Sequence, residues 1–284
     1  MSANSTQLSG KTCIVTGANT GIGKETALGL ARLGATVVMV CRDRERGEAA
    51  QREIKQQSRN DRLELMIYDF SSQNSIRQFA KDFKQLHDRL DVLVNNAGVV
   101  LRVRSMTEDG LESTFAINHL GYFLVTNLLL DILKKSAPSR IVSVASTAHK
   151  YGKLDLNAWP TGRDYSSFAA YANSKLANVL FTYELARRLE GTGITANCLH
   201  PGGVGTNLFR GLPKSLQALI KLVTISPERG ARTSIYLASS REVEGVTGKY
   251  FARRRQQKSS QASHNEEAGR RLWELSAELT GLNA

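Results

Sequence analysis

The 284-residue sequence predicts one α/β domain, a doubly wound parallel sheet with helices on both faces. Short apolar or β-branched runs alternate with longer segments of helical periodicity along the chain. The first run, residues 11–16, leads directly into the glycine-rich segment 17–23 and then into helical spacing over 24–33. The apolar fraction of 41% can fill one large core. Strand, glycine loop and helix in this order form the first unit of a Rossmann-type dinucleotide-binding fold.

The glycine loop predicts where a nucleotide binds. A side chain at Gly17, Gly21 or Gly23 would obstruct the turn and keep a pyrophosphate away from the helix N-terminus. Unpaired amides and the helix dipole attract anions at that end. A glycine motif alone is weak evidence, but here it lies between a strand and a helix, as nucleotide binding requires.

The end of the second strand predicts which dinucleotide binds. Residues 35–41 are almost all apolar, as expected for a strand that is covered on both faces, and Arg42 follows them. NAD-binding folds usually have an acid at this place, whereas a guanidinium can bind a 2′-phosphate. Asp43 comes one position later, so Arg42 could instead be a solvated loop residue. We favour NADP(H) over NAD(H).

The next segments continue the alternation. We expect a charged helix over 44–58, a third strand over 63–67 and a third helix over 72–86. Asp69 follows the third strand, where its carboxylate could accept a hydrogen bond from an adenine amino group. Residues 91–98 give a fourth strand that ends in small residues, which would let a cofactor approach the backbone.

A long helix is expected over 111–133, followed by a fifth strand over 140–146. Asn118 in this helix has apolar neighbours, so it is either a structural hydrogen-bonding residue or part of the site. We expect His119 to be structural. Ser146 ends the fifth strand, which places its hydroxyl at the sheet edge where the cofactor loops gather.

Residues 149–165 have no clear period and predict a loop beside the site. A helix over 166–189 precedes a sixth strand over 194–199, which is closed by the flexible segment 200–206. Residues 208–225 are amphipathic and predict a lid over an apolar pocket, with a surface or partner helix as the alternative. The lid as a whole is expected near residues 206–226.

The remaining segments complete the domain. Ser226, followed by a proline and a glutamate, starts another helix, and 248–251 form a short last strand. We expect the arginines 253–255 to form a solvated surface turn and the polar segment 256–264 to be exposed. A terminal helix is expected over 266–279. The chain thus divides into a polar extension, residues 1–10, and a single catalytic domain, residues 11–284.

Charge and cysteine content limit the function classes. The formal charge of +12, from 38 basic and 26 acidic residues, favours anionic ligands. We expect no nucleic-acid partner, because no recognition motif accompanies the basic residues. Cys13, Cys41 and Cys198 are far apart and mostly in apolar runs, so they predict buried thiols in a reducing compartment and no metal site. We expect no membrane span and a cytoplasmic location.

Tyr171 and Lys175 are the candidate catalytic pair. Four residues make about one helical turn, so the phenol and the ammonium share one face of a helix. An isolated phenol has a pKa of about 10, and a neighbouring ammonium stabilises the phenolate and lowers that pKa. The pair is therefore suited to acid–base chemistry. Its spacing also occurs by chance, so its significance depends on the rest of the chain.

The glycine loop, residues 95–98, Ser146 and the pair Tyr171/Lys175, in this order, resemble the short-chain dehydrogenases/reductases over essentially the whole chain. Segments 17–24, 118–121 and 270–273, together with the long loop before Tyr171, resemble the retinol dehydrogenase branch of that family. Ser146 and Tyr171 are 25 positions apart, which implies an unusual pocket entrance.

The resemblance implies a role for each catalytic candidate. Tyr171 would be the acid–base group, and Ser146 would bind the substrate oxygen as charge develops. Ser143 is a second serine on the same strand, but Ser146 lies at the strand's end. Lys175 would lower the phenol pKa and bind the nicotinamide ribose, while Asn118 would hold a water that links Lys175 to solvent.

The resemblance also implies the cofactor contacts. Asp69 would face the adenine, Asn95 the adenosine, and residues 201–206 the carboxamide and the lid hinge. The pyrophosphate would be faced by Gly17, Gly21, Ile22 and Gly23. The expected cofactor-binding set is Gly17, Asn19, Thr20, Gly21, Ile22, Gly23, Arg42, Asp69, Asn95, Ala97, Gly98, Tyr171, Lys175, Pro201, Gly202, Val204 and Thr206.

The expected function is an NADP(H)-dependent oxidoreductase that interconverts a hydrophobic alcohol, retinol-like or long aliphatic, and its aldehyde or ketone. A homo-oligomer, dimer or tetramer, is expected, and peripheral contact with a membrane surface is compatible with the lid sequence. The alternatives are a non-catalytic NADP(H)-sensing interaction protein on the same fold and a nucleic-acid binder.

Overall fold

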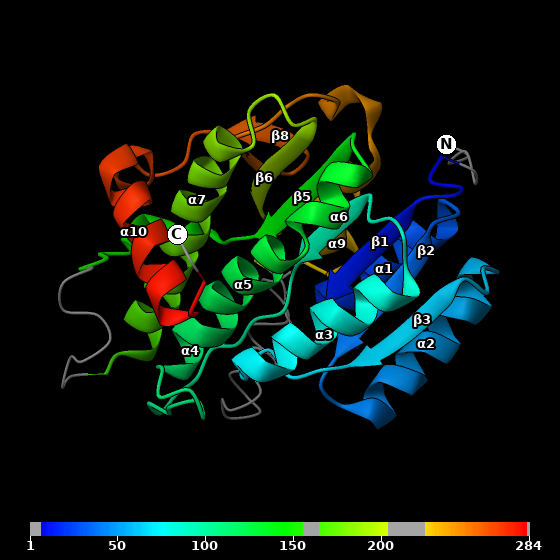
Figure 1. The fold of residues 1–284 in the computed structure, drawn as a ribbon, viewed down its shortest axis with the longest axis horizontal. Coiled ribbons are helices and arrows are strands. Elements are labelled where there is room, and N and C mark those ends of the chain that lie inside the picture. Colours follow the sequence, from blue (N-terminus) through cyan, green and yellow to red (C-terminus); the bar gives the residue numbers. More distant parts are fainter. Residues whose placement is uncertain (1–6, 156–164, 204–224, 283–284) are drawn as a thin grey trace.

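The structure, a computed structural model, describes residues 7–155, 165–203 and 225–282. Eight strands form one sheet in the order β3-β2-β1-β4-β5-β6-β7-β8 (Figure 1). All neighbours pair in parallel except β7 and β8, which are antiparallel. The strands are β1 Thr12–Thr16, β2 Thr36–Cys41, β3 Leu63–Ile67, β4 Val92–Asn95, β5 Ser139–Val144, β6 Ile194–His200, β7 Lys249–Ala252 and β8 Arg255–Gln257.

Helices cover both faces of the sheet. The α-helices are α1 Gly21–Arg32, α2 Arg44–Ser58, α3 Gln73–Leu86, α4 Ser113–Phe115, α5 Gly121–Leu128, α6 Leu130–Lys135, α7 Ser167–Arg188, α9 Pro227–Ser239 and α10 Glu266–Leu279. Alternate residues of β1 serve opposite cores, because successive strand side chains point to opposite faces. Ile14 packs in the core with α3, α5, α7 and α10, whereas Cys13 and Val15 pack in the core with α1, α2 and α9. The predicted doubly wound α/β fold is confirmed.

The strand order reverses between β1 and β4. The chain winds outward from β1 to β2 and β3, then returns to pair β4 with the other side of β1. Such a switch point leaves a crevice at the carboxyl ends of the two strands, because the loops that leave them turn to opposite faces. The glycine loop after β1 and the small residues after β4 both lie there.

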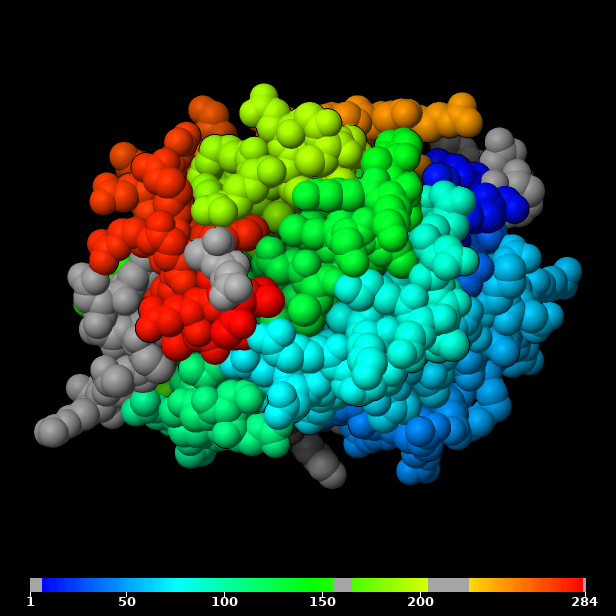
Figure 2. Space-filling model, viewed as in Figure 1, coloured from blue at the N-terminus to red at the C-terminus, as the bar shows by residue number. Residues whose placement is uncertain are grey.

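The C-terminal helix α10 packs on the core that contains Ile14 of β1 and side chains of α3, α5 and α7. Figure 2 shows α10, in red, against the cyan α3 segment on the molecular surface. The Gln73 side chain donates a hydrogen bond to the Leu279 carbonyl at 2.8 Å, and Trp273 of α10 is buried against Phe123 and Phe181. The terminal helix is therefore part of the domain's core packing.

Several expectations of detail were wrong. The single helix expected over 111–133 is divided into α4, a π-helical turn η1 (Ala116–Leu120), α5 and α6. The fifth strand ends at Val144, and Ser146 caps a short 3₁₀ helix, η2 (Thr147–Tyr151). The segment 256–264 is mostly exposed, as expected, but it also contains part of β8 and the 3₁₀ helix η5 (Gln261–His264), where Ser263 is buried.

Other expectations were correct. Cys13, Cys41 and Cys198 are buried and free. Arg253 and Arg254 form the exposed turn between β7 and β8. Ser226 caps α9 by accepting a hydrogen bond from the Arg229 amide.

No helix in the described ranges is both long enough and apolar enough to cross a membrane. The lid expected near 206–226 falls outside the described residues, apart from Ile225 and Ser226.

Candidate active site

The loop after β1 packs directly on the N-terminus of α1. Gly17 and Gly21 have φ values of 66° and 55°, in the left-handed region that favours glycine. A Cβ on Gly23 would lie 2.2 Å from the carbonyl oxygen of Gly17, so no larger residue fits there. Asn19, Thr20 and Ile22 are at least partly exposed around this turn. Because the turn at Gly17 packs closely on Gly23, the N-terminus of α1 stays open to a phosphate group. The glycine loop therefore fits a dinucleotide.

Thr16 and Asn96, which the sequence analysis did not select, hold the two sides of the crevice together. The Thr16 hydroxyl accepts hydrogen bonds from the amides of Asn96 and Ala97 at 2.9 and 3.0 Å. The Asn96 side chain donates to the Thr16 carbonyl at 2.8 Å. Their position where neighbouring parallel strands end was the available signal. The Asn95 side chain, by contrast, is fully buried and donates to Thr126, so it faces the core.

Lys175 lies beneath the exit of β4. Its residue is only 3% exposed, and its Nζ donates a hydrogen bond to the Val144 carbonyl at 2.9 Å. A Cβ on Gly98 would lie 3.2 Å from Asn118 Oδ1 and 3.7 Å from Lys175 Nζ. A glycine at position 98 therefore lets the β4 loop approach the ammonium closely. Burial lowers the pKa of Lys175 from 10.5 to about 7.

Asn118 uses both atoms of its amide within the protein. Its Oδ1 accepts from the Val99 amide at 2.7 Å, and its Nδ2 donates to the Val99 carbonyl and to the Ser174 hydroxyl. Ser174 in turn donates to the Tyr171 carbonyl at 2.8 Å. The side chain of Asn118 thus fastens the β4 loop to the helix that carries the candidate catalytic pair.

Tyr171 meets Ser146 at the carboxyl edge of the sheet. Tyr171 is in the second turn of α7, and the Ser146 side chain lies near enough to its phenol to lower the pKa of that phenol. Ser146 is partly exposed, whereas the alternative Ser143 is 1% exposed on β5. The geometry therefore brings Tyr171, Lys175 and Ser146 together and leaves Ser143 in the core.

The ionisation of Tyr171 differs from the expectation. Burial raises the pKa of Tyr171 above 10.0, and the Ser146 side chain opposes this shift. Lys175 Nζ lies 5.6 Å from the Tyr171 ring centroid and 5.7 Å from that of the buried Tyr122. The expected lowering of the phenol pKa by Lys175 is therefore not found, because desolvation dominates the ionisation of both groups.

Arg42, Asp43 and Asp69 follow β2 and β3, where the adenosine end of the cofactor is expected. Asp43 caps α2 by accepting from the Arg46 amide at 3.0 Å and pairs with the Arg46 guanidinium. Arg42 is exposed at the carboxyl end of β2. Asp69 Oδ1 accepts from the Ser71 amide at 2.8 Å, which fixes the carboxylate in the loop after β3. Arg42 and Asp69 follow adjacent strands at the same sheet edge.

The exit of β6 approaches the same edge. Pro201 and Gly202 are partly exposed, and Gly202 has a φ of 106°. A Cβ there would lie 2.4 Å from Ile225 Cδ1, and the Ile225 amide donates to the Gly203 carbonyl at 2.8 Å. The chain ends flanking residues 204–224 are therefore joined. The candidates Val204 and Thr206 lie outside the described residues.

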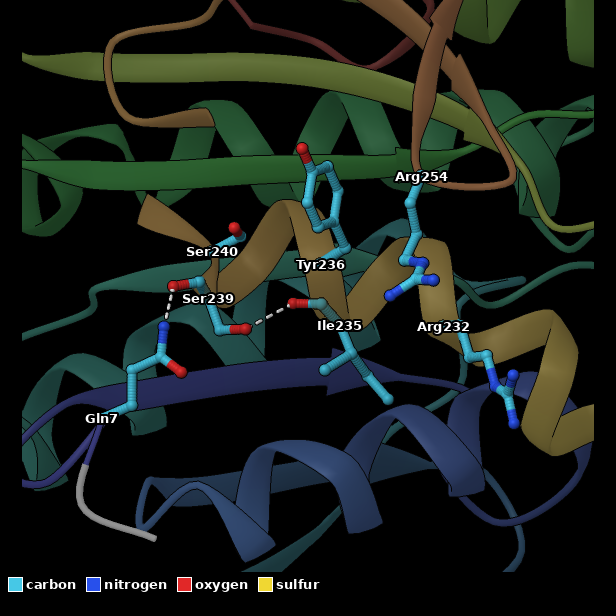
Figure 3. Close-up of a pocket in the computed structure, with 7 residues that line it drawn as sticks. All are labelled: Gln7, Arg232, Ile235, Tyr236, Ser239, Ser240 and Arg254. Carbon is cyan, nitrogen blue, oxygen red and sulfur yellow. Dashed lines mark hydrogen bonds between the residues drawn. The ribbon is translucent and has the colours of Figure 1, made fainter. Parts of the chain in front are cut away.

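A separate groove of about 370 Å³ runs along α9 (Figure 3). Its lining residues are Gln7, Arg232, Ile235, Tyr236, Ser239, Ser240 and Arg254. At one end, Gln7 donates to the Ser239 carbonyl, and Ser240 accepts from Arg140, next to the start of β5. This end lies at the amino edge of the sheet, opposite the edge where Tyr171 and Ser146 meet.

Comparison with known proteins agrees with this geometry. A family model described as short chain dehydrogenase matches residues 11–217. The chain is 48% identical to retinol dehydrogenase 13 of Homo sapiens over 97% of its own length and 86% of that protein. A crystal structure of an uncharacterised protein from Mycobacterium paratuberculosis superposes with a TM-score of 0.78 at 34% identity, covering 97% of this chain and 95% of that one. The Pseudomonas aeruginosa RhlG/NADP active-site complex superposes with a TM-score of 0.70 at 27% identity, covering 87% and 96%.

Burial of Lys175 predicts how stability depends on pH. Its pKa is 10.5 when unfolded and about 7 when folded. Between these values the unfolded chain binds more protons, so the contribution of Lys175 to stability rises with pH. Below about pH 7 the buried ammonium destabilises the fold most. We expect Lys175→Met to increase the free energy of unfolding there by about 0.5–2 kcal/mol.

Urea unfolding at several pH values between about 6 and 10 measures this effect. The gain of Lys175→Met over the wild type should shrink as pH rises toward 10.5. Lys81→Met, an exposed lysine on α3, is the matched control and should show no such trend. A gain from Lys175→Met that is constant across the pH range would contradict a lowered pKa.

Proposed function

The chain belongs to the short-chain dehydrogenase family, and we propose that it is an NADP(H)-dependent member that interconverts a hydrophobic alcohol and its aldehyde or ketone. That it is an oxidoreductase using a nicotinamide cofactor follows from the family and from its retinol dehydrogenase relatives. The observation that carries the proposal for its residues is the placement of the Ser146 side chain near the Tyr171 phenol, with the buried Lys175 Nζ 5.6 Å from the Tyr171 ring centroid.

The residues of the site divide the work of carbonyl reduction. The nicotinamide supplies the hydride when the cofactor is bound. Tyr171 donates its phenolic proton to the substrate oxygen. The Ser146 oxygen accepts from the Ala148 amide at 3.1 Å, and its hydroxyl proton can point toward the substrate. Ser146 therefore stabilises the negative charge that develops on the substrate oxygen before protonation is complete.

Lys175 supplies the positive charge that the phenolate requires. The ammonium is fixed by its hydrogen bond to Val144, so it cannot move away from Tyr171 when the phenol loses its proton. A negative group placed above Gly98 would favour the charged form of Lys175. Asn118 keeps the β4 loop against α7 through Val99 and Ser174. The proposal that it also positions a water remains a prediction.

The preference for NADP(H) rests on Arg42. Asp43 is engaged as the cap of α2 and as an ion-pair partner of Arg46, so Arg42 is the side chain at the end of β2 that is suited to a 2′-phosphate. The solved structure of RhlG holds NADP on the same fold, which supports this choice.

The substrate class rests on the relatives and on the sequence of the predicted lid. Relatives at 45–48% identity are named retinol dehydrogenases, which supports a bulky apolar alcohol or aldehyde. The apolar side chains within 208–223 would extend such a pocket. A cytoplasmic location and a homo-oligomer remain predictions from the sequence.

Replacement of Tyr171 tests the chemistry. We expect Tyr171→Phe to retain cofactor affinity within about threefold and to lose turnover by about 10²–10⁴-fold, because only the acid–base group is removed. Tyr236→Phe, in the groove on α9, is the control and should keep wild-type turnover. Steady-state kinetics and cofactor titration measure both effects. Wild-type turnover by Tyr171→Phe would remove this tyrosine from the mechanism.

Replacement of Arg42 tests the cofactor. Arg42→Asp should weaken NADPH binding by about 10–100-fold, because charge-assisted hydrogen bonds to the phosphate are lost and a like charge is introduced. NADH binding should change much less. Arg52→Asp makes the same charge change on the exposed side of α2 and serves as the control. Equal losses for both cofactors in Arg42→Asp would assign Arg42 a structural role.

A graded substrate panel tests the pocket. Each methylene buried adds at most about 0.8 kcal/mol, nearly fourfold in binding. Catalytic efficiency toward linear aldehydes should therefore rise with chain length and then level off when the pocket is full. Highest efficiency with short polar carbonyls or sugars would contradict an apolar pocket.

A further inference from the structure

His149 is a fully buried histidine in a short surface helix. It belongs to η2, which begins directly after Ser146, and its neighbours Lys150 and Tyr151 are exposed, Tyr151 by 70%. The imidazole instead points inward and packs against the Tyr250 ring, with 4.9 Å between the centroids. A polar ring in such a place must satisfy both of its nitrogens within the protein.

Both ring nitrogens have backbone partners. Nδ1 lies 2.6 Å from the Ser146 carbonyl oxygen, and Nε2 lies 3.0 Å from the Ser260 amide nitrogen. A carbonyl oxygen only accepts and an amide only donates, so the proton is on Nδ1 and Nε2 is the acceptor. Burial lowers the pKa of His149, which favours this neutral form. Neither nitrogen is left to exchange a proton with a substrate.

The hydrogen bond on the Nδ1 side restrains Ser146. The Ser146 carbonyl accepts from the His149 amide at 3.1 Å as well as from Nδ1, and the Ser146 hydroxyl oxygen accepts from the Ala148 amide. Ser146 is no longer on a strand, because β5 ends at Val144. The imidazole therefore supplies a restraint that the sheet does not provide at this residue.

The Nε2 side reaches a distant part of the chain. Ser260 precedes η5, and the adjacent Ser259 hydroxyl is bonded to Tyr183 of α7 at 2.8 Å and to His264 at 3.0 Å. Ser263 adds a hydrogen bond to Ser259 at 2.7 Å. This network anchors Ser260 to α7, the same helix that carries Tyr171 and Lys175. The imidazole thus joins Ser146 to a support fixed on the catalytic helix.

We propose that His149 is a positioning residue for the reaction: its Nδ1–H holds the Ser146 backbone so that the serine hydroxyl stays in register with Tyr171, while its Nε2 anchors the ring on the segment around Ser260. This inference rests on the proposed role of Ser146. It assigns His149 no proton transfer of its own, and it predicts that the donor toward Ser146 matters more for turnover than the acceptor toward Ser260.

Two amide variants separate the two contacts. The side-chain amide nitrogen of His149→Asn can replace Nδ1, so this variant keeps the donor to Ser146 and loses the acceptor for Ser260. The amide oxygen of His149→Gln can replace Nε2, so this variant keeps the acceptor and loses the donor. His149→Phe removes both. His87→Gln, at the end of α3, is the control for the same chemical change at a remote site.

Turnover, KM and NADPH affinity are measured for each variant, with thermal unfolding as the check of folding. We expect His149→Gln and His149→Phe to lose about 10–100-fold in kcat while KM and NADPH affinity change less than about threefold. His149→Asn should stay within about fivefold of the wild-type kcat. Equal losses in the Asn and Gln variants, in kcat or in folding, would make His149 a packing residue and contradict the proposal.

A double-mutant cycle with Ser146→Ala completes the test. If His149 acts through the Ser146 hydroxyl, adding His149→Gln to Ser146→Ala should reduce kcat by less than about threefold further. Additive losses would contradict the proposal. Wild-type turnover by Ser146→Ala alone would instead overturn the proposed role of Ser146. An inactive Ser146→Ala together with fully active His149→Gln and His149→Phe would overturn only the role of His149.

Discussion

The burial of one ammonium group shapes the candidate site. Lys175 is almost fully buried, so its charge must be compensated within the protein. The Val144 carbonyl, two tyrosine rings and the glycine exit of β4 surround it. Each comes from a different element, so the ends of β4 and β5 and the start of α7 must all approach one point. The lowered pKa of Lys175 reflects the free-energy cost of burying its charged form at this point.

The sheet topology supplies the other half of the site. Because β1 and β4 are neighbours whose loops diverge, the glycine turn after β1 and residues 96–98 face one crevice. Thr16 and Asn96 fix its two sides through backbone contacts, and Gly23 permits the turn to pack on α1. The residues proposed for cofactor binding and for proton transfer therefore lie along one edge of the sheet, although they are far apart in sequence.

The sequence was sufficient for the fold and for placing most candidate residues at one edge of the sheet, because both depend on local pattern: strand and helix periods, the glycine loop, and polar residues at strand ends. It could not give properties that depend on which elements meet. The raised pKa of Tyr171 follows from burial, and the Asn95 side chain turns inward to bond with Thr126. The π turn carries Asn118, whose amide bonds to Ser174 of α7. Likewise, β8 and η5 lie in a polar segment without a clear period.

Two buried neutral histidines extend the site to the end of the chain. Nε2 of His119 lies 2.9 Å from the Ser276 hydroxyl of α10, and its Nδ1 lies 3.4 Å from Asn178 of α7; burial lowers its pKa to about 3. His149 similarly joins Ser146 to Ser260. Both C-terminal partners lie beyond residue 217, where the family match ends. The region that the family model matches thus holds the proposed reactive groups, whereas the C-terminal segments contact the helix and the serine that carry them.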